Sequence, residues 1–540
     1  MSLEVVYFLS AEIVLVAAAL LIYMGGAFST AQKPWAPLAL VAIGLAAFAL
    51  HRQDDKTPGP LVPAHAAATP SYNVERDVDT ITPVIADPLA KFGRWFALAV
   101  GAVMVLMAWR PLGTGAMAEY LGSLLLIVAG LMLVSVASNL VLLFVGLELI
   151  SIPTYILLTL GRNDPASQEA AAKYFYLSIL ASAVLLYGLS FVYGTTGSMQ
   201  LSVIRLKLSY AAMLPEGFES LVKLGMVLVL AGLCFRMAAA PFHFYAPDVY
   251  QGTIHANAAL LSVLPKAAGL LAVVRLIVFG MPEMGLFGWK IVLAISVLTM
   301  TLGNVLALWQ DNVRRLLAYS SIANAGYMLI GIAVGLVPNV VTTGGRVVWN
   351  GVGAAFFYLC VYAAATLGAF AVLVCLGRQR QQIESVDELA GLGRTRPVLA
   401  AALAVCMFSL AGLPPVAGLW GKLLVFGSAL NVGGDLWPWF TTLAVIGVLN
   451  AAVAACYYLR IVSVMYFREP LAVRRAEGGA GAGLAALVCT LVVLVVGFYP
   501  APLMKGCIEA GKRVQFSVFS VQKNASVLPN TETRTLNTEH

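Results

Sequence analysis

The length of its apolar segments constrains this chain more than any other feature. About fourteen segments carry the roughly 20 apolar residues that a helix needs to cross the hydrocarbon of a bilayer. Inside lipid, only helices and closed barrels satisfy their own backbone hydrogen bonds. Charged residues make up 11% of the chain, against about 25% in a typical soluble domain. The sequence therefore predicts an all-α, polytopic membrane protein surrounded by the lipid bilayer.

The predicted spans follow one another with mostly short connections. They cover residues 3–25, 34–50, 92–109, 119–138, 140–160, 171–194, 222–240, 255–280, 289–309, 316–336, 350–377, 397–430, 438–467 and 482–504. We predict one transmembrane domain over 1–510, with an extended polar loop at 51–91 and a polar C-terminal tail at 511–540. Glu4 and Glu12 stand where a signal peptide carries positive charge, so we expect the first segment to be retained as a span.

Lysine and arginine in the short loops indicate which side of the membrane each loop faces. Loops after odd-numbered spans carry the clusters: Arg314, Arg315, Arg378, Arg380, Arg394, Arg396, Arg468, Arg474 and Arg475. Short loops after even-numbered spans carry fewer such residues: Arg205, Lys207, Lys290 and Arg346. Because positively charged loops stay inside, both termini are predicted to lie outside.

Several kinds of chemistry are not expected in this chain. Its 7 cysteines are dispersed and form no CxxC motif, which argues against iron–sulfur and zinc sites. The run "GGAGAG" at 478–483 lacks the GxGxxG spacing and the strand–helix context of a nucleotide loop. There is no basic tract to suggest nucleic acid. We therefore predict no cofactor and no metal in this chain.

Proline and glycine interrupt two of the spans. The seventh ends in "RMAAAPFHFYAPDVYQG", which contains Pro241, and the twelfth contains "SLAGLPPVAGLWGKLLVF", with Pro414 and Pro415. Proline removes a backbone donor and clashes with the preceding turn. Ordinary kinks would explain both breaks, but interrupted helices at matching places in two halves are typical of inverted-repeat transporters. The offset of five spans also reverses the helix direction, as an inverted repeat requires.

The fifth span carries a carboxylate with no charged neighbour in its own helix. Glu148 lies in "LLFVGLELISIPTY", and a charge at the bilayer centre costs about 2.5–3.5 kcal/mol. Ser151 and Tyr155 share its helix face, and Arg236 in the seventh span is the nearest candidate countercharge. The pair is open to a structural interpretation as an ion pair and to a functional one as a titrating carboxylate.

Two lysines are the strongest candidates for proton carriers. Lys266 lies in the middle of the eighth span, too deep to reach water by snorkelling, with Ser262 one turn earlier. Burial disfavours the charged form of lysine, which suits it to exchange protons near neutral pH. Lys422 follows the break in the twelfth span, where carbonyls freed by Pro414 and Pro415 can solvate it.

The remaining polar groups in the spans have less specific positions. A polar stripe runs along the tenth span: Ser320, Asn324 and Tyr327. Lys173 begins the sixth span, where snorkelling and a relay role are equally open. Arg460 is near enough to a helix end to be an anchor, and we interpret His243 and His255 as loop hydrogen-bonding residues. Sparse titratable groups linked by water can pass protons through a membrane protein, and low dielectric couples them strongly.

Five segments resemble the subunit N family of bacterial respiratory complex I, the proton-pumping NADH:quinone oxidoreductase, among its antiporter-like membrane subunits. They are "LLFVGLELISIPTY", "PFHFYAPDVYQG", "ALWQDNVRRLLAYSSIANAGYMLIG", "LAGLPPVAGLWGK" and "YYLRIVSVMYF". The resemblance runs from about residue 88 to about 470, and the DVYQG string is its most specific element. It implies fourteen helices with two inverted five-helix repeats, which we place at 119–280 and 289–467.

The resemblance also implies function, partners and location. It places the family's conserved charges on Glu148, Lys173, Lys266 and Lys422. It implies proton translocation driven by quinone chemistry in neighbouring subunits, which would hold NADH, flavin, iron–sulfur clusters and quinone. A hetero-oligomer with other complex I membrane subunits, including a neighbouring antiporter-like subunit, is expected in the bacterial inner membrane, with both termini periplasmic.

Two positions depart from the family pattern. Arg236 replaces the seventh-span lysine and cannot release a proton, and Asn324 stands where the tenth span often has a histidine. Two alternative functions therefore remain open. One is a subunit of a multi-subunit cation/proton antiporter, and the other is a structural membrane spacer that has lost transport.

Overall fold

The computed structural model describes residues 3–29, 34–54, 83–109, 116–161, 164–209, 218–337, 350–377, 382–470 and 479–511. Most of the predicted loop at 51–91 and of the tail at 511–540 lies outside these residues. Arg346, Arg378, Arg380, Arg474 and Arg475, which were counted for orientation, also lie outside them. Helix α3 continues to Asp54 and α4 begins at Pro88, so the connection is shorter than predicted at both ends.

Helices dominate the described part of the chain. The first ten are α1 (Leu3–Phe8), α2 (Ser10–Phe28), α3 (Trp35–Asp54), α4 (Pro88–Met107), α5 (Met117–Val136), α6 (Leu140–Leu160), α7 (Pro165–Thr196), α8 (Leu201–Ser209), α9 (Phe218–Met237) and α10 (Ala246–Gly252). The others are α11 (His255–Val273), α12 (Gly285–Leu308), α13 (Val313–Gly335), α14 (Gly351–Leu376), α15 (Leu392–Thr395), α16 (Pro397–Ala411), α17 (Ala417–Leu430), α18 (Trp437–Phe467) and α19 (Gly479–Phe498). Pairing between extended segments is limited, in these residues, to isolated bridges.

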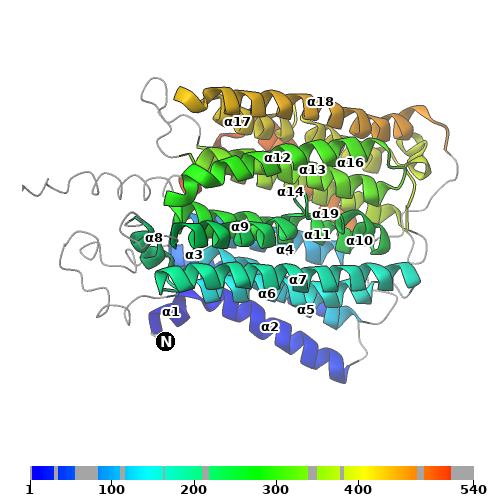
Figure 1. Cartoon of the computed structure of the whole chain (residues 1–540). Coiled ribbons are helices and arrows are strands. Elements are labelled where there is room, and N and C mark those ends of the chain that lie inside the picture. Colours follow the sequence, from blue (N-terminus) through cyan, green and yellow to red (C-terminus); the bar gives the residue numbers. More distant parts are fainter. Residues whose placement is uncertain are drawn as a thin grey trace, which may run out of the picture.

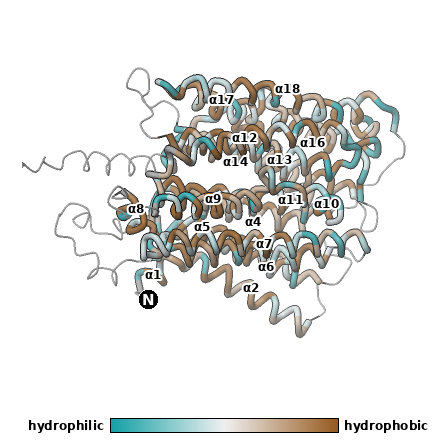
Figure 2. Tube along the Cα trace, in the orientation of Figure 1, coloured by the Kyte–Doolittle hydropathy of each residue, from teal (hydrophilic) through white to brown (hydrophobic). Residues whose placement is uncertain are grey.

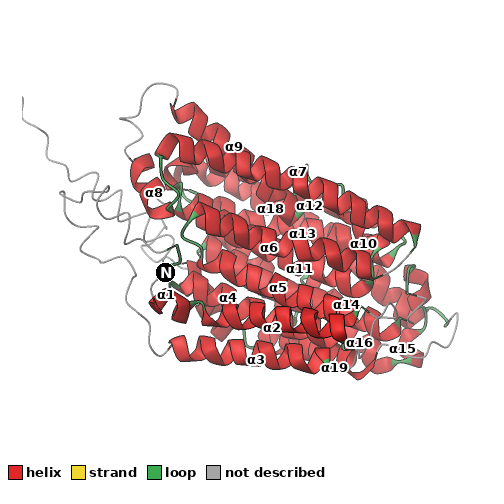
Figure 3. Cartoon of the chain, turned by 90° about the horizontal axis from the view of Figure 1, so that it is seen from below, coloured by secondary structure: helices red, strands yellow, loops and turns green. Residues whose placement is uncertain are grey.

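The long helices lie side by side along one direction, as Figures 1 and 3 show from two sides. Thirteen helices of the described residues are long and apolar enough to cross a membrane. The tandem of two shorter apolar helices, α16 and α17, accounts for the remaining predicted span. Hydrophilic residues gather at the two ends of the bundle, while the middle of most helices is hydrophobic (Figure 2). The chain is therefore a multi-span membrane protein, as predicted.

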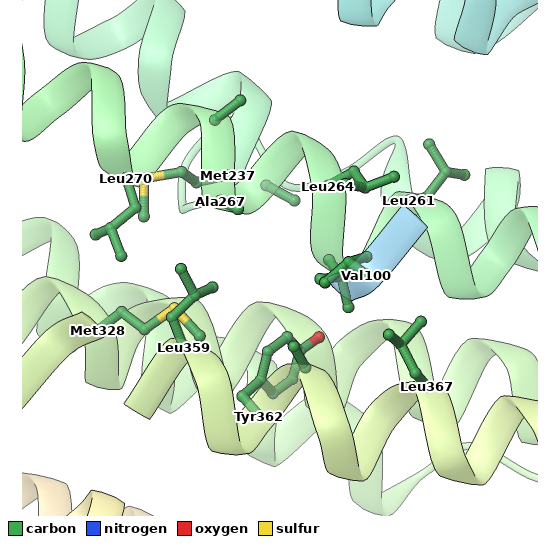
Figure 4. Close-up of a cluster of buried hydrophobic side chains, with 14 of the residues drawn as sticks. Val100, Met237, Leu261, Leu264, Ala267, Leu270, Met328, Leu359, Tyr362 and Leu367 are labelled. Carbon is green, nitrogen blue, oxygen red and sulfur yellow. The ribbon is translucent and has the colours of Figure 1, made fainter. Parts of the chain in front are cut away.

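Burial varies from helix to helix and identifies the centre of the bundle. The segment from His255 to Phe279, which contains α11 and a following π-helical turn, is buried from His255 to Val278. By contrast, only about a third or less of α2 and α3 is buried. Figure 4 shows Leu264 and Leu270 of α11 packing toward Leu359 and Tyr362 of α14. The predicted eighth span is thus the core helix of the bundle.

The predicted breaks in the seventh and twelfth spans are confirmed. Helix α9 ends at Met237, and the chain crosses Pro241 before the short helix α10 begins. The backbone N–H of Ala240 donates to Thr299 Oγ1 of α12 at 2.9 Å, so the break leaves this donor satisfied. Helix α16 ends at Gly412, whose φ of +85° is a left-handed conformation that favours glycine. Helix α17 begins after Pro414 and Pro415.

One arginine of the predicted loop clusters lies inside the protein instead. The side chain of Arg314 at the start of α13 is fully buried and donates to Thr253 O, to Gln382 Oε1 at 3.0 Å and to Glu384 Oε1 at 2.9 Å. It ties the start of α13 to the chain before α11 and to the segment after α14. Its guanidinium therefore makes a structural contact between these segments.

A buried ion pair fastens the N-terminal helices to the bundle. Arg94 of α4 donates to Glu12 Oε2 of α2 at 2.7 Å, to Gln53 Oε1 of α3 at 3.0 Å and to Phe8 O at 2.7 Å. Both charged side chains are almost completely buried, at 2% and 3% exposure. One guanidinium therefore joins the peripheral helices, which bury little apolar surface of their own.

Breaking this pair from one side is expected to destabilise the protein. Arg94→Leu leaves the Glu12 carboxylate buried without its partner, at a cost of about 3–5 kcal/mol, whereas the double variant Glu12→Leu/Arg94→Leu regains most of that loss. The measurement is the thermal denaturation midpoint of the purified complex in detergent. Arg468→Leu, which removes an exposed pair with Asp387, is the control and is expected to cost less than about 1 kcal/mol. A double variant as unstable as Arg94→Leu would contradict this assignment.

Candidate functional site

Glu148 has the countercharge that its sequence requires. Arg236 of α9 donates through Nη2 to Glu148 Oε1 at 2.6 Å, and through Nη1 to Ser151 Oγ and to Leu147 O at 3.0 Å. Ser182 Oγ of α7 donates to the same carboxylate oxygen at 2.6 Å. Helices α6, α7 and α9 therefore meet around one ion pair. Glu148 remains about a quarter exposed, at 23%, so one side of the pair is open.

Tyr155 extends this cluster toward the middle of the protein. Its hydroxyl donates to Ser178 Oγ at 3.0 Å. Its ring lies 5.7 Å from that of Tyr174, which in turn lies 5.7 Å from that of Tyr245, just before α10. Tyr174 and Tyr245 are buried. A line of tyrosines thus leads from the carboxylate on α6 to the interrupted seventh span.

Lys173 is not part of the Glu148 cluster. It lies nine residues before Ser182 on α7, which is roughly 13 Å along the helix. Its Nζ contacts Glu169 at 2.7 Å and Asp248 of α10 at 3.0 Å, and its side chain is 41% exposed. The structure therefore places Lys173 in an ion-pair cluster near one end of the bundle.

Lys266 lies at the centre of the protein, with 1% exposure. Its Nζ donates to Ser321 Oγ at 2.5 Å and also to the carbonyl of Ser321 on α13. Tyr362 Oη donates to Ser321 Oγ at 2.7 Å, and Tyr250 Oη lies 3.4 Å from the same atom. Among the described residues, no carboxylate pairs with this ammonium. A lysine solvated by neutral oxygens can release its proton more easily than one held by an anion.

Ser262, which shares a helix face with Lys266, contributes differently from the expectation. Its hydroxyl donates to Ala259 O of its own helix at 2.6 Å. Its carbonyl accepts from Tyr362 Oη at 3.2 Å. Ser321, rather than Ser262, therefore provides the hydroxyl that contacts Lys266.

The polar stripe of the tenth span forms a hydrogen-bonded network with neighbouring helices. Ser320 Oγ is bonded to Tyr458 Oη of α18, and Asn324 Nδ2 donates to the same hydroxyl at 3.3 Å. Asn324 Oδ1 accepts from Tyr358 Oη of α14 at 2.5 Å. Because Ser320 adjoins Ser321, the network begins beside Lys266. Asn324 cannot titrate, but the hydroxyls on both sides of it can donate and accept.

Tyr327 connects this network to a second branch. Its hydroxyl accepts from Asn304 Nδ2 of α12 at 3.0 Å, and Asn304 Oδ1 accepts from Tyr457 Oη at 3.0 Å. Its ring lies edge-on to that of Tyr358, with centroids 6.1 Å apart. The stripe that the sequence indicates on α13 is therefore buried against tyrosines of α14 and α18.

Lys422 is solvated by the break in its own span, as expected. Its Nζ donates to Leu410 O at 3.0 Å and to Ala411 O at 2.6 Å, in the last turn of α16. The ammonium also lies 5.4 Å from the ring centroid of Tyr327. The side chain is 5% exposed. Since helix C-terminal carbonyls carry partial negative charge, the end of α16 can hold this lysine without a carboxylate.

Several residues of the site were not predicted. The network depends on Ser321 and on the following hydroxyl and amide side chains: Tyr250, Tyr358, Tyr362, Tyr457, Tyr458 and Asn304. Tyr358 and Tyr362 are four residues apart in an apolar span and share a helix face. That spacing is a signal in the sequence, although tyrosine alone does not distinguish a polar path from ordinary packing.

The other positions that the sequence singled out lie away from this network. Arg460 donates to Asp311 Oδ1 at 2.5 Å and to Gln310 O at 3.3 Å, which fits an anchor at the end of α18. His243 lies in the break after α9, where its carbonyl accepts from Ala246 N at 3.1 Å. No group of three or more metal-ligating side chains occurs among the described residues.

One apolar cavity is separate from the charged residues. It has a volume of about 390 Å³ and lies between α4, α14 and α19. Its lining includes Trp95, Phe96, Cys360, Leu367 and Val492. These side chains are hydrocarbon apart from the indole N–H of Trp95 and the thiol of Cys360, so the cavity does not contribute to a path of titratable groups.

Comparisons with known proteins identify the family. A family model described as NADH:quinone oxidoreductase/Mrp antiporter, TM matches residues 137–449. A protein of Trichlorobacter lovleyi named NADH-quinone oxidoreductase subunit N is 40% identical over 346 residues, which cover 64% of this chain and 66% of that protein. A protein of the same name from Rhizorhabdus wittichii is 38% identical over 443 residues, covering 80% of this chain and 86% of that protein.

A solved structure supports the same family assignment. A chain of respiratory complex I from Thermus thermophilus is similar to this one with a TM-score of 0.72 and 30% identity, covering 92% of this chain and 98% of that chain. The matched family region contains Glu148, Lys266 and Lys422, together with both breaks. The chain therefore belongs to the NADH:quinone oxidoreductase/Mrp antiporter family of membrane proteins, and within it to the NADH-quinone oxidoreductase subunit N proteins.

Proposed function

We propose that this chain translocates protons as a membrane subunit of an NADH:quinone oxidoreductase. The observation that carries the proposal is the pair of buried lysines, Lys266 and Lys422, each solvated by neutral oxygens. Tyr362 donates to the serine that contacts Lys266, and the ring of Tyr327 lies beside Lys422. An ammonium without a carboxylate partner can deprotonate and recharge as its surroundings change. NADH, flavin, iron–sulfur clusters and quinone would belong to partner subunits.

Each charged residue has a distinct role in this proposal. Lys266 and Lys422 accept and release protons. Glu148 is held in an ion pair with Arg236, which stays charged and cannot carry a proton. Lys173 lies outside the Glu148 cluster, so its contribution would be electrostatic and indirect. A charge that moves at one site changes the proton affinity of the next, because coupling is strong where the dielectric is low.

The proposal extends to organisation and surroundings. Two inverted repeats, at 119–280 and 289–467, would place the breaks after α9 and between α16 and α17 at matching positions within a single domain. The chain would be part of a hetero-oligomer in a bacterial inner membrane, with both termini on the periplasmic side. Quinone reduction in neighbouring subunits would drive the protons, and another antiporter-like subunit would adjoin this one.

A subunit of a cation/proton antiporter is the second candidate, because the matched family includes Mrp antiporters. The two functions differ in what drives transport. An antiporter subunit would give growth that depends on Na⁺ or K⁺ without linked NADH oxidation. Proton uptake into vesicles that requires NADH and a quinone, and that is insensitive to Na⁺ and K⁺, favours the first function.

Lys266 provides the decisive test of pumping against a structural spacer. In assembled complex, Lys266→Ala is expected to lower NADH-driven proton pumping by about a hundredfold, the lower end of what positioned proton-transfer groups contribute. Lys266→Arg keeps the charge but cannot deprotonate, so it is expected to lose pumping as well. Pumping is measured in inverted vesicles and normalised to complex content. Unchanged pumping in both variants would indicate a spacer.

Glu148→Gln is expected to reduce pumping less than Lys266→Ala does. The glutamine oxygen still accepts from Ser182 and Arg236, and the fixed charge of Arg236 remains beside the site. The two variants are compared in the same vesicle assay at equal complex content. An equal or greater loss in Glu148→Gln would count against the roles assigned to these residues.

The tyrosine network gives an independent prediction. Tyr458→Phe removes a buried hydroxyl that contacts Ser320 and Asn324, and leaving such groups unpaired costs about 1–3 kcal/mol. We expect pumping to fall about fivefold or more, in line with that loss. Tyr187→Phe on α7, whose side chain is exposed, is the matched control and is expected to pump like the parent protein. Full pumping by Tyr458→Phe would exclude its hydroxyl from the path.

A further inference from the structure

A cluster of opposite charges surrounds the short helix α10. Asp248 of α10 contacts Lys173 of α7 at 3.0 Å and Arg315 of α13 at 2.9 Å. Arg315 also donates to Gln251 Oε1 of α10 at 2.9 Å. One carboxylate thereby connects α10 to two long helices on different sides. These contacts belong to the DVYQG segment, whose part in the protein is not explained by the path of Lys266 and Lys422.

The opposite face of α10 reaches the centre of the protein. Tyr250 follows Asp248 by two residues, so the two side chains leave the helix about 200° apart. Tyr250 is 2% exposed, and its hydroxyl lies 3.4 Å from Ser321 Oγ. The same Ser321 oxygen accepts from Lys266 at 2.5 Å. Helix α10 therefore contacts the charge cluster with one face and the partner of Lys266 with the other.

The position of α10 depends on such tertiary contacts. It has seven residues, follows the break at Pro241, and is too short to be stable on its own. The ion pairs of Asp248 are partly exposed, at 39% for the carboxylate. Pairs of this kind add little to global stability, but they can fix where a short helix sits.

We propose that Asp248 is a positioning residue for the buried proton site. Through Lys173 and Arg315 it holds α10 so that Tyr250 stays against Ser321, which keeps the Ser321 hydroxyl oriented toward Lys266. Asp248 does not itself carry a proton in this role. The inference rests on the proposed function, because it assigns Asp248 to the geometry of Lys266. In this arrangement Lys173 is one of the two cations that hold α10 in place.

The test uses the whole complex in inverted vesicles with four variants. Asp248→Asn removes the charge and keeps the shape, Asp248→Glu keeps the charge, Tyr250→Phe removes the hydroxyl, and the fourth combines Asp248→Asn with Tyr250→Phe. Asp311→Asn is the control. It breaks the ion pair with Arg460 that Asp311 makes just before the start of α13, and this pair does not involve α10. NADH-driven proton pumping is measured per assembled complex.

We expect Asp248→Asn and Tyr250→Phe each to lower pumping about fivefold, as for one lost hydrogen bond. Asp248→Glu should retain at least about half of the parent rate, since it restores the charge that pairs with Lys173 and Arg315. The pumping rate of the double variant should be at least that of the slower single variant, because both changes act on one contact. Asp311→Asn should pump like the parent.

Three results would overturn the inference. The first is parental pumping by Asp248→Asn, the second is losses that multiply in the double variant, and the third is no rescue by Asp248→Glu. If Asp248→Asn does not assemble, Asp248→Glu and Tyr250→Phe still decide the question through their rates. Pumping that is lost in Lys266→Ala but normal in Asp248→Asn rejects only this inference, whereas normal pumping in Lys266→Ala rejects the proposed function.

Discussion

A polar group within the bilayer costs free energy unless it finds a partner inside the protein. Water cannot satisfy backbone or charged groups in hydrocarbon, so each unsatisfied group costs several kcal/mol. Arg94 joins the peripheral helices α2 and α3 through Glu12 and Gln53, and Thr299 accepts from the backbone N–H of Ala240 in the break after α9. The charges that remain without a carboxylate partner are therefore the informative ones.

The charged residues of the site are stabilised in two different ways. Glu148 is held by a permanent cation and a hydroxyl, which fixes an ion pair at the side of the bundle. Lys266 and Lys422 are held by a serine and by carbonyls at a helix end. An ion pair resists changes in protonation, whereas neutral oxygens stabilise an ammonium only partly. In the proposed function the lysines are therefore the groups whose charge changes, with Lys422 held by carbonyls at a break and Lys266 held by Ser321.

Tyrosine side chains lie near both Lys266 and Lys422. Asn324 cannot exchange protons, yet it lies between the hydroxyls of Tyr358 and Tyr458 and is oriented by both. A network of this kind has donors and acceptors in alternation, and its members polarise one another. Because Asn324, Tyr358 and Tyr458 come from three different helices, a shift of one helix would alter the contacts among them. This explains how a short helix such as α10 can influence a lysine that it does not touch.

The membrane spans, both breaks and the charged residues within the spans could be predicted from the sequence alone. These follow from the length of apolar runs, from the backbone limits of proline and from the cost of a charge in lipid, all of which are local properties. The pairing of Glu148 with Arg236 could also be predicted, because Arg236 was the nearest candidate countercharge. Only the tertiary structure decided that Lys173 pairs with Asp248, that Ser321 rather than Ser262 contacts Lys266, and that Arg314 is buried. Those partners lie between 55 and 75 positions apart in the chain, and which faces of two distant helices meet depends on the packing of the whole bundle.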